Sequence, residues 1–485
     1  MYLLGIDLGT SSVKVVLMDE EQRVIGSQQH NLGVTRLHPG WSEQEPADWL
    51  DATERVMQAL RLAHPLEMAA VKGIALAGHM HGATLLGEGD RVLRPCILWN
   101  DTRSFQEAAQ LDADPQFRAI SGNIVFPGFT APKLLWVKNH EPEIFARVHK
   151  VLLPKDYVRL WLSGDYASDM SDAAGTAWLD VGKRRWSPEL LAASGMDESQ
   201  MPTVAEGTDI TGVLRPELAQ RWGIQGTPVI AGGAGDNAAA ACGMGTVAAG
   251  SAFVSLGTSG VLFAANARYL PNPASAVHTF CHALPDTWHQ MGVILSATDS
   301  LNWYANLTGQ TPAVLTAALG ESLHAPSPAT FLPYLSGERT PHNDAAIRGA
   351  FVGLAHDSSQ QVLTQAVLEG VAFAIRDNLA ALHAAGTELT RVTAVGGGSR
   401  SLYWLKILAT VLDMPIDLPA EGDFGAAFGA ARLALIAASG ADPLQICTPP
   451  ATQTTIEPEQ QHRAAYAAAY ARYCRLYPAL KGALA

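Results

Sequence analysis

Short apolar runs separated by polar turns open the chain. Runs over residues 1–7, 13–19 and 24–32 predict three strands in a meander, because runs of this length bounded by Gly, Ser and charged residues are typical of strands. A second hairpin is predicted much later. There an apolar run over 252–256 is followed by a Gly-Thr-Ser-Gly turn and by another apolar run from Val261.

The two predicted hairpins carry nearly the same turn. The first reads LGTSS at 8–12 and the second reads LGTSG at 256–260. A repeat of strand, turn and strand predicts that a chain is built from two related halves. We therefore expect two large domains, residues 1–247 (the first half) and 248–485 (the second half).

Helical and extended patterns alternate through the rest of the chain. Apolar residues at helical spacing predict helices, and continuous apolar runs predict strands. Their alternation is typical of α/β proteins. The predicted helices cover 47–64, 297–307, 359–385, 422–438 and a tail from Glu457, and the predicted strands cover 71–77, 290–295 and 392–395. Loops or irregular segments are expected at 155–157, 170–176, 266–285 and 337–342. A Glu338–Arg339 ion pair is expected to hold the last of these at the surface, and the alternative is that it meets the first half.

Both hairpin turns contain residues that suit phosphate binding. Glycine lets the backbone come close to a phosphate, while Thr and Ser offer hydroxyl and amide donors. The candidates are Thr10 and Ser11 in the first turn and Gly257, Thr258 and Ser259 in the second. Each turn alone is compatible with a plain turn, but two facing hairpins would hold a nucleotide's phosphates between the halves. Neither turn is a P-loop, because GxxxxGK[ST] is missing. Neither is a dinucleotide-binding fingerprint, because a strand and not a helix is predicted after each turn.

Two acidic residues stand beside these turns. Asp236 and Asn237 follow a glycine-rich run and begin an alanine-rich helix just before the second hairpin. An acid there would suit a base for phosphoryl transfer, although Asp is also a favoured helix N-cap. Asp7 ends the first strand, where its carboxylate would project toward the phosphates; the alternative is a solvated turn residue.

Composition limits the class of protein. The net charge of −13 argues against a nucleic-acid partner, whereas the charge of ATP can be offset locally by Mg²⁺, backbone amides and helix N-termini. The five cysteines are scattered without CxxC spacing, which favours reduced thiols in the cytoplasm. The N-terminal apolar run is too short for a signal peptide, and no run of 18 uncharged apolar residues predicts a membrane span.

Several segments resemble the FGGY carbohydrate kinases, within the larger actin/Hsp70/sugar-kinase ATPase fold. GFTAPKLLWVKNH at 128–140, with Lys133 in place, is similar to the first signature of the family. GAFVGLAH at 349–356 followed by AVLEG at 366–370 resembles the second. This second match is looser, because the family usually has a polar residue near the position of Val362.

Two further segments resemble the family members that act on xylulose. They are GHMHGATLL at 78–86 and YLSGERTPH at 334–342. The first usually begins Gly-Gln-Met-His, and here His79 replaces the Gln.

The resemblance implies two actin-like (ribonuclease H-like) α/β ATPase domains with ATP and sugar meeting in the cleft between them. It implies phosphorylation of D-xylulose at its 5-hydroxyl by Mg-ATP. Asp236 would accept the hydroxyl proton, helped by its closeness to the target rather than by a large pKa change. Asp7 would organise the Mg²⁺ ion through water. Lys133 is expected to hold the fold together rather than to touch a ligand.

The resemblance also divides the candidate binding residues into a sugar-binding set and a nucleotide-binding set. Gly396 to Ser399, between a strand and a helix, would let the backbone approach adenosine closely. His81 is expected to hydrogen-bond sugar hydroxyls, with Met80 as an apolar wall, because ligands commonly bind where α/β strands end. The sugar-binding candidates are Met80, His81, Trp99, Asp236 and Asn237, and the nucleotide-binding candidates are Thr10, Ser11, Gly257, Thr258, Ser259, Gly397, Gly398 and Ser399.

Two other functions stay open at this stage. One is a sister kinase that acts on ribulose, glycerol or gluconate, and the other is an actin- or Hsp70-like protein that uses ATP to move or assemble. The sugar-kinase segments argue against the second. The sequence leaves open whether the chain forms a homodimer.

Overall fold

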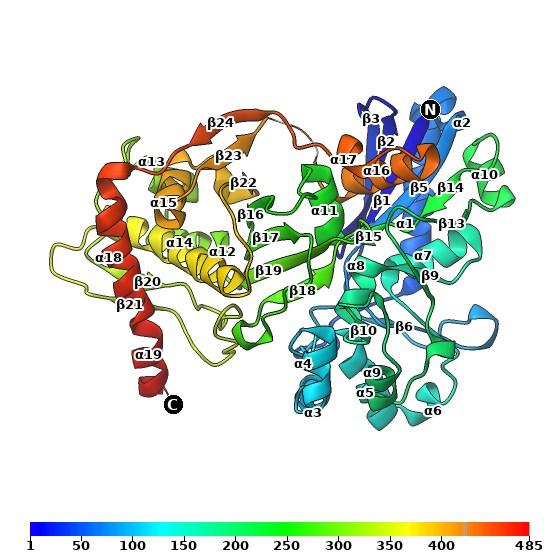
Figure 1. The fold of residues 1–485 in the computed structure, drawn as a ribbon, viewed down its shortest axis with the longest axis horizontal. Coiled ribbons are helices and arrows are strands. Elements are labelled where there is room, and N and C mark those ends of the chain that lie inside the picture. Colours follow the sequence, from blue (N-terminus) through cyan, green and yellow to red (C-terminus); the bar gives the residue numbers. More distant parts are fainter. Residues whose placement is uncertain (421, 423, 485) are drawn as a thin grey trace.

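Two mixed β-sheets, each covered by helices, organise the protein (Figure 1). The computed structural model describes residues 1–420, 422 and 424–484. The strand order is β13-β14-β5-β1-β2-β3 in the first sheet, with β15 paired to β5, and β18-β19-β17-β16-β22-β23-β24 in the second. The strands of the first sheet are β1 (Tyr2–Leu8), β2 (Ser12–Asp19), β3 (Val24–Asn31), β5 (Val71–Gly78), β13 (Ile210–Val213), β14 (Val229–Ala231) and β15 (Ala234–Gly235). Those of the second are β16 (Ala252–Leu256), β17 (Gly260–Asn266), β18 (His278–Cys281), β19 (Trp288–Ile294), β22 (Val392–Val395), β23 (Ile416–Pro419) and β24 (Thr452–Ile456).

The two sheets repeat the same arrangement around their hairpins. Strand β1 pairs antiparallel with β2 and parallel with β5, and β16 pairs antiparallel with β17 and parallel with β22. A short turn can join only antiparallel neighbours, whereas a parallel neighbour needs a longer crossover. The repeat predicted from the two Gly-Thr-Ser turns is thus confirmed as a repeat of topology.

Helices cover the sheets, and short ladders lie outside them. The helices of the first half are α1 (Pro46–Ala63), α2 (Pro65–Ala69), α3 (Phe105–Asp112), α4 (Pro115–Ser121), α5 (Thr130–His140), α6 (Pro142–Phe145), α7 (Pro154–Ser163), α8 (Met170–Ala173), α9 (Pro188–Ala193), α10 (Pro216–Trp222) and α11 (Asp236–Met244). Those of the second half are α12 (Thr298–Thr308), α13 (Pro312–Ala317), α14 (Gln360–Ala384), α15 (Leu402–Leu412), α16 (Ala426–Ser439), α17 (Pro443–Ile446), α18 (Arg463–Cys474) and α19 (Leu476–Leu484). The short ladders pair β4 (Glu43–Gln44) with β7 (Cys96–Ile97), β6 (Thr84–Leu86) with β8 (Lys150–Leu152), β9 (Ala167–Asp169) with β12 (Thr203–Ala205), β10 (Leu179–Asp180) with β11 (Arg185–Trp186), and β20 (Thr330–Leu332) with β21 (Ala350–Val352).

One helix of the second half packs on the sheet of the first. Helix α16 follows β23 in the chain, yet its alanine-rich face lies against β1, β2 and β5, as Figure 1 shows. Close approach depends on glycine, because a Cβ built on Gly5 would lie 1.9 Å from the carbonyl oxygen of Ala427. Helix α16 also crosses α11, where a Cβ on Gly429 would lie 1.8 Å from the carbonyl oxygen of Ala239. The crossing of α11 and α16 therefore joins a helix of the first half to a helix of the second through close backbone contact.

The predicted elements agree with the structure except in a few places. The helices at 47–64, 297–307 and 359–385 are confirmed as α1, α12 and α14 within two residues. The helix predicted over 422–438 begins at Ala426 as α16, and Asp423 lies outside the described residues.

Three segments expected to lack regular structure contain some. Residues 155–157 lie in α7, and 170–176 form α8 and a 3-10 turn (η2, Ala174–Thr176). Strand β18 lies within 266–285. At 155–157 and 170–176 the expectation of loops was wrong because polar composition favours loops only where the side chains meet water, and here most of them are buried. Strand β18 is buried as well, through its pairing with β19.

No helix in the described part of the chain is both long and apolar enough to cross a bilayer.

Candidate active site

The two hairpin turns present unused amide donors. In the first turn, Gly9 N–H donates to the carbonyl of Ser12 (2.9 Å). In the second, the N–H and hydroxyl of Thr298 donate to the Gly257 carbonyl (2.9 and 2.7 Å), tying the turn to the start of α12. Within the described residues, no backbone N–H of 10–11 or 257–259 donates to a protein acceptor. These amides and the neighbouring hydroxyls are therefore available for phosphate oxygens.

The glycine turn after β22 borders a large cavity. Gly396 adopts φ 88°, and the 3-10 turn η5 (Gly397–Arg400) follows it. Gly397 and Gly398 line a cavity of about 880 Å³ that extends to Thr298 and to Asn302 on α12. A space of this size suits a nucleoside, and it lies next to the second phosphate turn because Thr298 contacts both.

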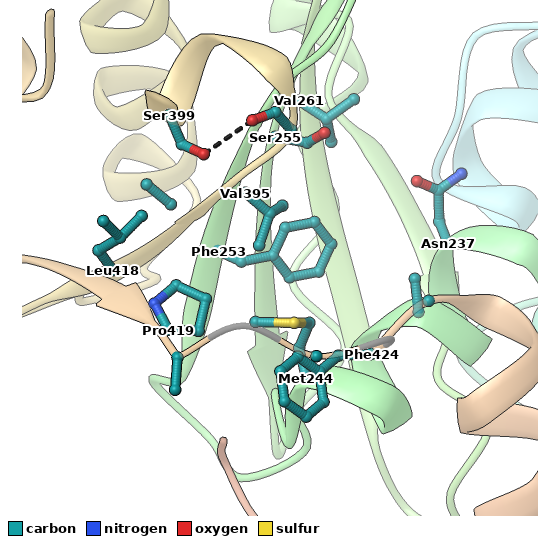
Figure 2. Close-up of a pocket in the computed structure, with 16 residues that line it drawn as sticks. Asn237, Met244, Phe253, Ser255, Val261, Val395, Ser399, Leu418, Pro419 and Phe424 are labelled. Carbon is teal, nitrogen blue, oxygen red and sulfur yellow. Dashed lines mark hydrogen bonds between the residues drawn. The ribbon is translucent and has the colours of Figure 1, made fainter. Parts of the chain in front are cut away.

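A second cavity, of about 450 Å³, lies on the other side of the same turn (Figure 2). Ser399 lines it from η5, where its hydroxyl donates to the Gly396 carbonyl (2.7 Å), and Asn237 lines it from α11. Phe253 and Met244 supply much of the apolar wall. The structure thus separates Ser399 from Gly397 and Gly398, and brings it toward the helix that carries Asp236.

Asp236 begins α11 immediately after β15. Its Oδ1 accepts hydrogen bonds from the backbone N–H (2.7 Å) and the side-chain amide (2.8 Å) of Asn237. Burial raises the pKa of Asp236 to about 6, and the two bonds from Asn237 oppose that rise. The expectation of no large pKa change was therefore wrong. A carboxylate with a pKa near 6 is a stronger base than an ordinary Asp and is still ionised at neutral pH.

Met80 links the segment of His81 to the segment of Asp236. A Cβ on Gly235 would lie 2.9 Å from Cγ of Met80, and one on Gly175 would touch both Met80 and His81. The Nδ1–H of His81 donates to the Gly175 carbonyl (2.6 Å), and its ring stacks on Phe129 with 4.7 Å between centroids. Burial lowers the pKa of His81 to about 3, so the ring is neutral at physiological pH. Since Nδ1 carries the proton, Nε2 is an acceptor suited to a hydroxyl group.

Lys133, expected to hold the fold together, contacts the backbone of His81. Its ammonium group donates to the carbonyls of His81 (2.7 Å) and Gly128 (2.5 Å). His81 has φ 71°, an unusual conformation for a residue with a Cβ. The buried lysine stabilises this conformation, and burial lowers its pKa to about 7.

The remaining candidates occupy the edges of the site. Asp7 is on β1 opposite Lys14, two residues before the first turn. Trp99 is 47% exposed and donates its indole N–H to the hydroxyl of Thr10 (2.9 Å), so it lies beside the first phosphate turn. His79 is buried against Trp49, and burial lowers its pKa to about 3. A contact between Trp99 and sugar stays a prediction.

The segment 337–342 connects the halves instead of forming an exposed ion-paired loop. Within the described residues no ion pair joins Glu338 to Arg339. The buried Glu338 carboxylate instead accepts the backbone N–H groups of Leu295 (3.1 Å) and Arg339 (2.8 Å). The Arg339 guanidinium approaches Nε2 of His278 (3.2 Å) and lies 4.7 Å from the ring centroid of Phe126, in the first half. The expected Glu338–Arg339 pair was therefore wrong.

The groups that orient His81 and the start of α11 were not among the predicted site residues. The carbonyl of Gly175 accepts the ring N–H of His81, and the hydroxyl of Ser171 accepts the N–H of Gly235 just before Asp236 (3.0 Å). Both lie in the segment taken for a loop. The only signal in the sequence was the helix-capping pattern Asp-Met-Ser-Asp at 169–172, which indicates a helix start but no contact.

Comparisons with known proteins agree with this architecture. The family model for the N-terminal domain of FGGY carbohydrate kinases matches residues 2–243, and the model for the C-terminal domain matches 252–438. The xylulose kinase of Escherichia coli (strain K12) is 52% identical over 485 residues, 99% of each chain.

Two solved structures have the same fold. The crystal structure of a xyloylose kinase from Brucella ovis is 66% identical and covers 99% of this chain and 100% of its own, with a TM-score of 0.99. That of a gluconate kinase from Lactobacillus acidophilus is 26% identical and covers 99% and 98%, with a TM-score of 0.91. Two matching domain models and a full-length relative leave one conclusion: the chain belongs to the FGGY family of carbohydrate kinases.

Proposed function

We propose that the chain transfers the γ-phosphoryl group of Mg-ATP to the 5-hydroxyl of D-xylulose, forming D-xylulose 5-phosphate for the use of xylose. The observation that carries the proposal is the packing of Met80, the neighbour of His81, against Gly235, the neighbour of Asp236. This contact joins the segment of the proposed sugar histidine to the segment of the proposed base. The choice of xylulose is supported by the E. coli and B. ovis relatives.

In the proposed reaction, one bond forms and one breaks at the γ-phosphorus. The sugar oxygen bonds to phosphorus, the bond to the β-phosphate oxygen breaks, and Asp236 takes the hydroxyl proton. Such enzymes act mainly by positioning groups and stabilising charge. The free amides of 10–11 and 257–259 would hold phosphate oxygens, while the cavity beside Gly397 and Gly398 would take adenosine.

Asp7 is the residue we propose for Mg²⁺. Carboxylate oxygens and waters are the ligands that Mg²⁺ prefers, and Asp7 is the last but one residue of β1, just before the first turn with its amide donors. When bound, the ion would neutralise charge on the β- and γ-phosphates. The first half, 1–247, would then supply the sugar site, the metal residue and the base, and the second half, 248–485, most of the nucleotide site.

We place this activity in the cytoplasm. Cys96, Cys242, Cys281 and Cys447 are buried free thiols and Cys474 is an exposed one, as a reducing compartment would keep them.

A panel of sugars tests the substrate. We expect D-xylulose to give the highest kcat/KM in an ADP-release assay, ahead of ribulose, glycerol and gluconate. Gluconate belongs in the panel because the gluconate kinase from L. acidophilus shares the fold. A higher kcat/KM with any of the other three would overturn the choice of xylulose while leaving the chemistry of Asp236 in place.

Replacing His81 tests the sugar contact. Loss of Nε2 would leave a sugar hydroxyl without its partner, so we expect His81→Ala to weaken xylulose use by about 1–3 kcal/mol in kcat/KM. The binding constant of ATP measured without sugar should stay unchanged.

Two further variants separate the side chain from the backbone. His81→Asn keeps a residue that tolerates positive φ, and His30→Ala removes an exposed histidine of β3. We expect His81→Asn to share the loss and His30→Ala to match the wild type. Equal losses of sugar and nucleotide binding in both His81 variants would indicate a structural histidine.

A further inference from the structure

A fully buried charged cluster lies beneath the catalytic segment. The ammonium group of Lys155 is 2.6 Å from Asp156, 2.7 Å from Asp169 and 3.1 Å from Asp172, and all four side chains are 0% exposed. Burying these charges opposes folding unless each charge has an opposite charge and hydrogen-bond partners close to it. The three carboxylates raise the pKa of Lys155, which stays charged. A second buried cation, Arg159, lies 3.6 Å from Asp156, and the hydroxyl of Ser168 donates to Asp156 (2.7 Å), so the cluster is a buried polar anchor.

Hydrogen bonds lead from this anchor to Asp236. Oδ1 of Asp169 accepts the N–H (2.9 Å) and the hydroxyl (2.5 Å) of Ser171 at the start of α8. The hydroxyl oxygen of Ser171 in turn accepts the backbone N–H of Gly235 (3.0 Å). Gly235 is the N-cap of α11, and the next residue is Asp236.

The same segment also orients the sugar histidine. Its last turn, η2, includes Gly175, whose carbonyl accepts Nδ1–H of His81 (2.6 Å). Residues 169–176 thus contact the backbone before Asp236 at one end and the ring of His81 at the other.

We propose that Ser171 is a positioning residue for the phosphoryl transfer, acting through the Gly235 peptide on Asp236. The Gly235 N–H is buried, so without the Ser171 hydroxyl it loses its partner, and the peptide that carries Asp236 is free to turn toward another acceptor. Small displacements of a catalytic group have large effects on rate. This inference rests on the proposed role of Asp236 but not on which sugar is the substrate.

Ser171→Ala tests the inference against Ser121→Ala as a matched control. Ser121 is also buried and also accepts a backbone N–H, from Asn123 (3.2 Å), at the end of α4. We expect kcat to fall about tenfold or more in Ser171→Ala, with the KM values for sugar and ATP within about twofold of wild type. Ser171→Ala and Ser121→Ala should lower the melting temperature by similar amounts. Ser121→Ala should nevertheless leave kcat unchanged.

A conservative variant guards against simple loss of folding. Ser171→Thr keeps the hydroxyl acceptor, and we expect it to recover most of the kcat lost in Ser171→Ala. For each variant, kcat is calculated per molecule of enzyme that binds nucleotide. A kcat for Ser171→Ala equal to that of Ser121→Ala would overturn the inference and leave the proposed function standing. Equal kcat losses in Ser171→Ala and Ser171→Thr would also overturn it, because the hydroxyl would then be irrelevant. Each variant is assayed with the sugar that the wild type uses fastest, so a wrong choice of xylulose does not affect this comparison.

Discussion

Asp236→Ala is expected to lower kcat for sugar phosphorylation by roughly 100-fold or more, with the dissociation constant of ATP unchanged. Asp236 is the acid at the start of α11, next to the Gly235 on which Met80 packs, and burial raises its pKa to about 6. Without the carboxylate, the attacking hydroxyl has no base to take its proton. Steady-state kinetics and a nucleotide-binding titration measure the two quantities separately.

The pH dependence gives an independent check of the same role. The base acts only when it is deprotonated, so kcat/KM of the wild type should rise about tenfold per pH unit below pH 6 and level off above it. Asp236→Asn should lose this acid limb together with most of the rate. Asp48→Ala removes an exposed acid from the first turn of α1 and should behave as wild type. Near-normal turnover by a folded Asp236→Ala enzyme would contradict the assignment.

Gly429→Ala is expected to lower the free energy of unfolding by about 3 kcal/mol. The added methyl group would lie 1.8 Å from the carbonyl oxygen of Ala239 and 2.9 Å from the backbone nitrogen of Gly243, so α16 and α11 would have to move apart. Backbone atoms cannot rotate away as a flexible side chain can. Because α11 carries Asp236 and α16 packs on the first sheet, activity should fall with stability. Urea unfolding followed by circular dichroism measures the change.

A second helical glycine provides the matched control. Gly482 lies in α19, where a Cβ would meet nothing within 4 Å. Gly482→Ala should be neutral or stabilise the protein by up to about 1 kcal/mol, as alanine does in an exposed helix. If Gly429→Ala is as stable as Gly482→Ala, the two helices do not depend on the close backbone contact.

The hairpins and their repeat could be predicted because their signals are local. A short apolar run, a Gly-Thr-Ser turn and a second short run can form only an antiparallel pair. The helices α1, α12 and α14 were predicted for the same reason, since apolar spacing within one segment decides which face is buried. By contrast, the partner of α16 lies more than 400 residues away on β1, and nothing in the spacing of its alanines identifies that sheet.

For the site, the sequence was enough to identify Asp236, His81 and the Gly, Thr and Ser donors of the phosphate turns as candidates. Their protonation states depend on the fold. Burial by the surrounding chain raises the pKa of Asp236 and lowers that of His81, and a protonation state cannot be deduced from a residue's neighbours in sequence. The polar residues at 155–157 and 170–176 show the same limit, because their composition predicts loops when the partners of each charge are unknown. Long-range contacts supply those partners: Lys155 is buried against Asp169, and the Ser171 hydroxyl accepts the N–H of Gly235.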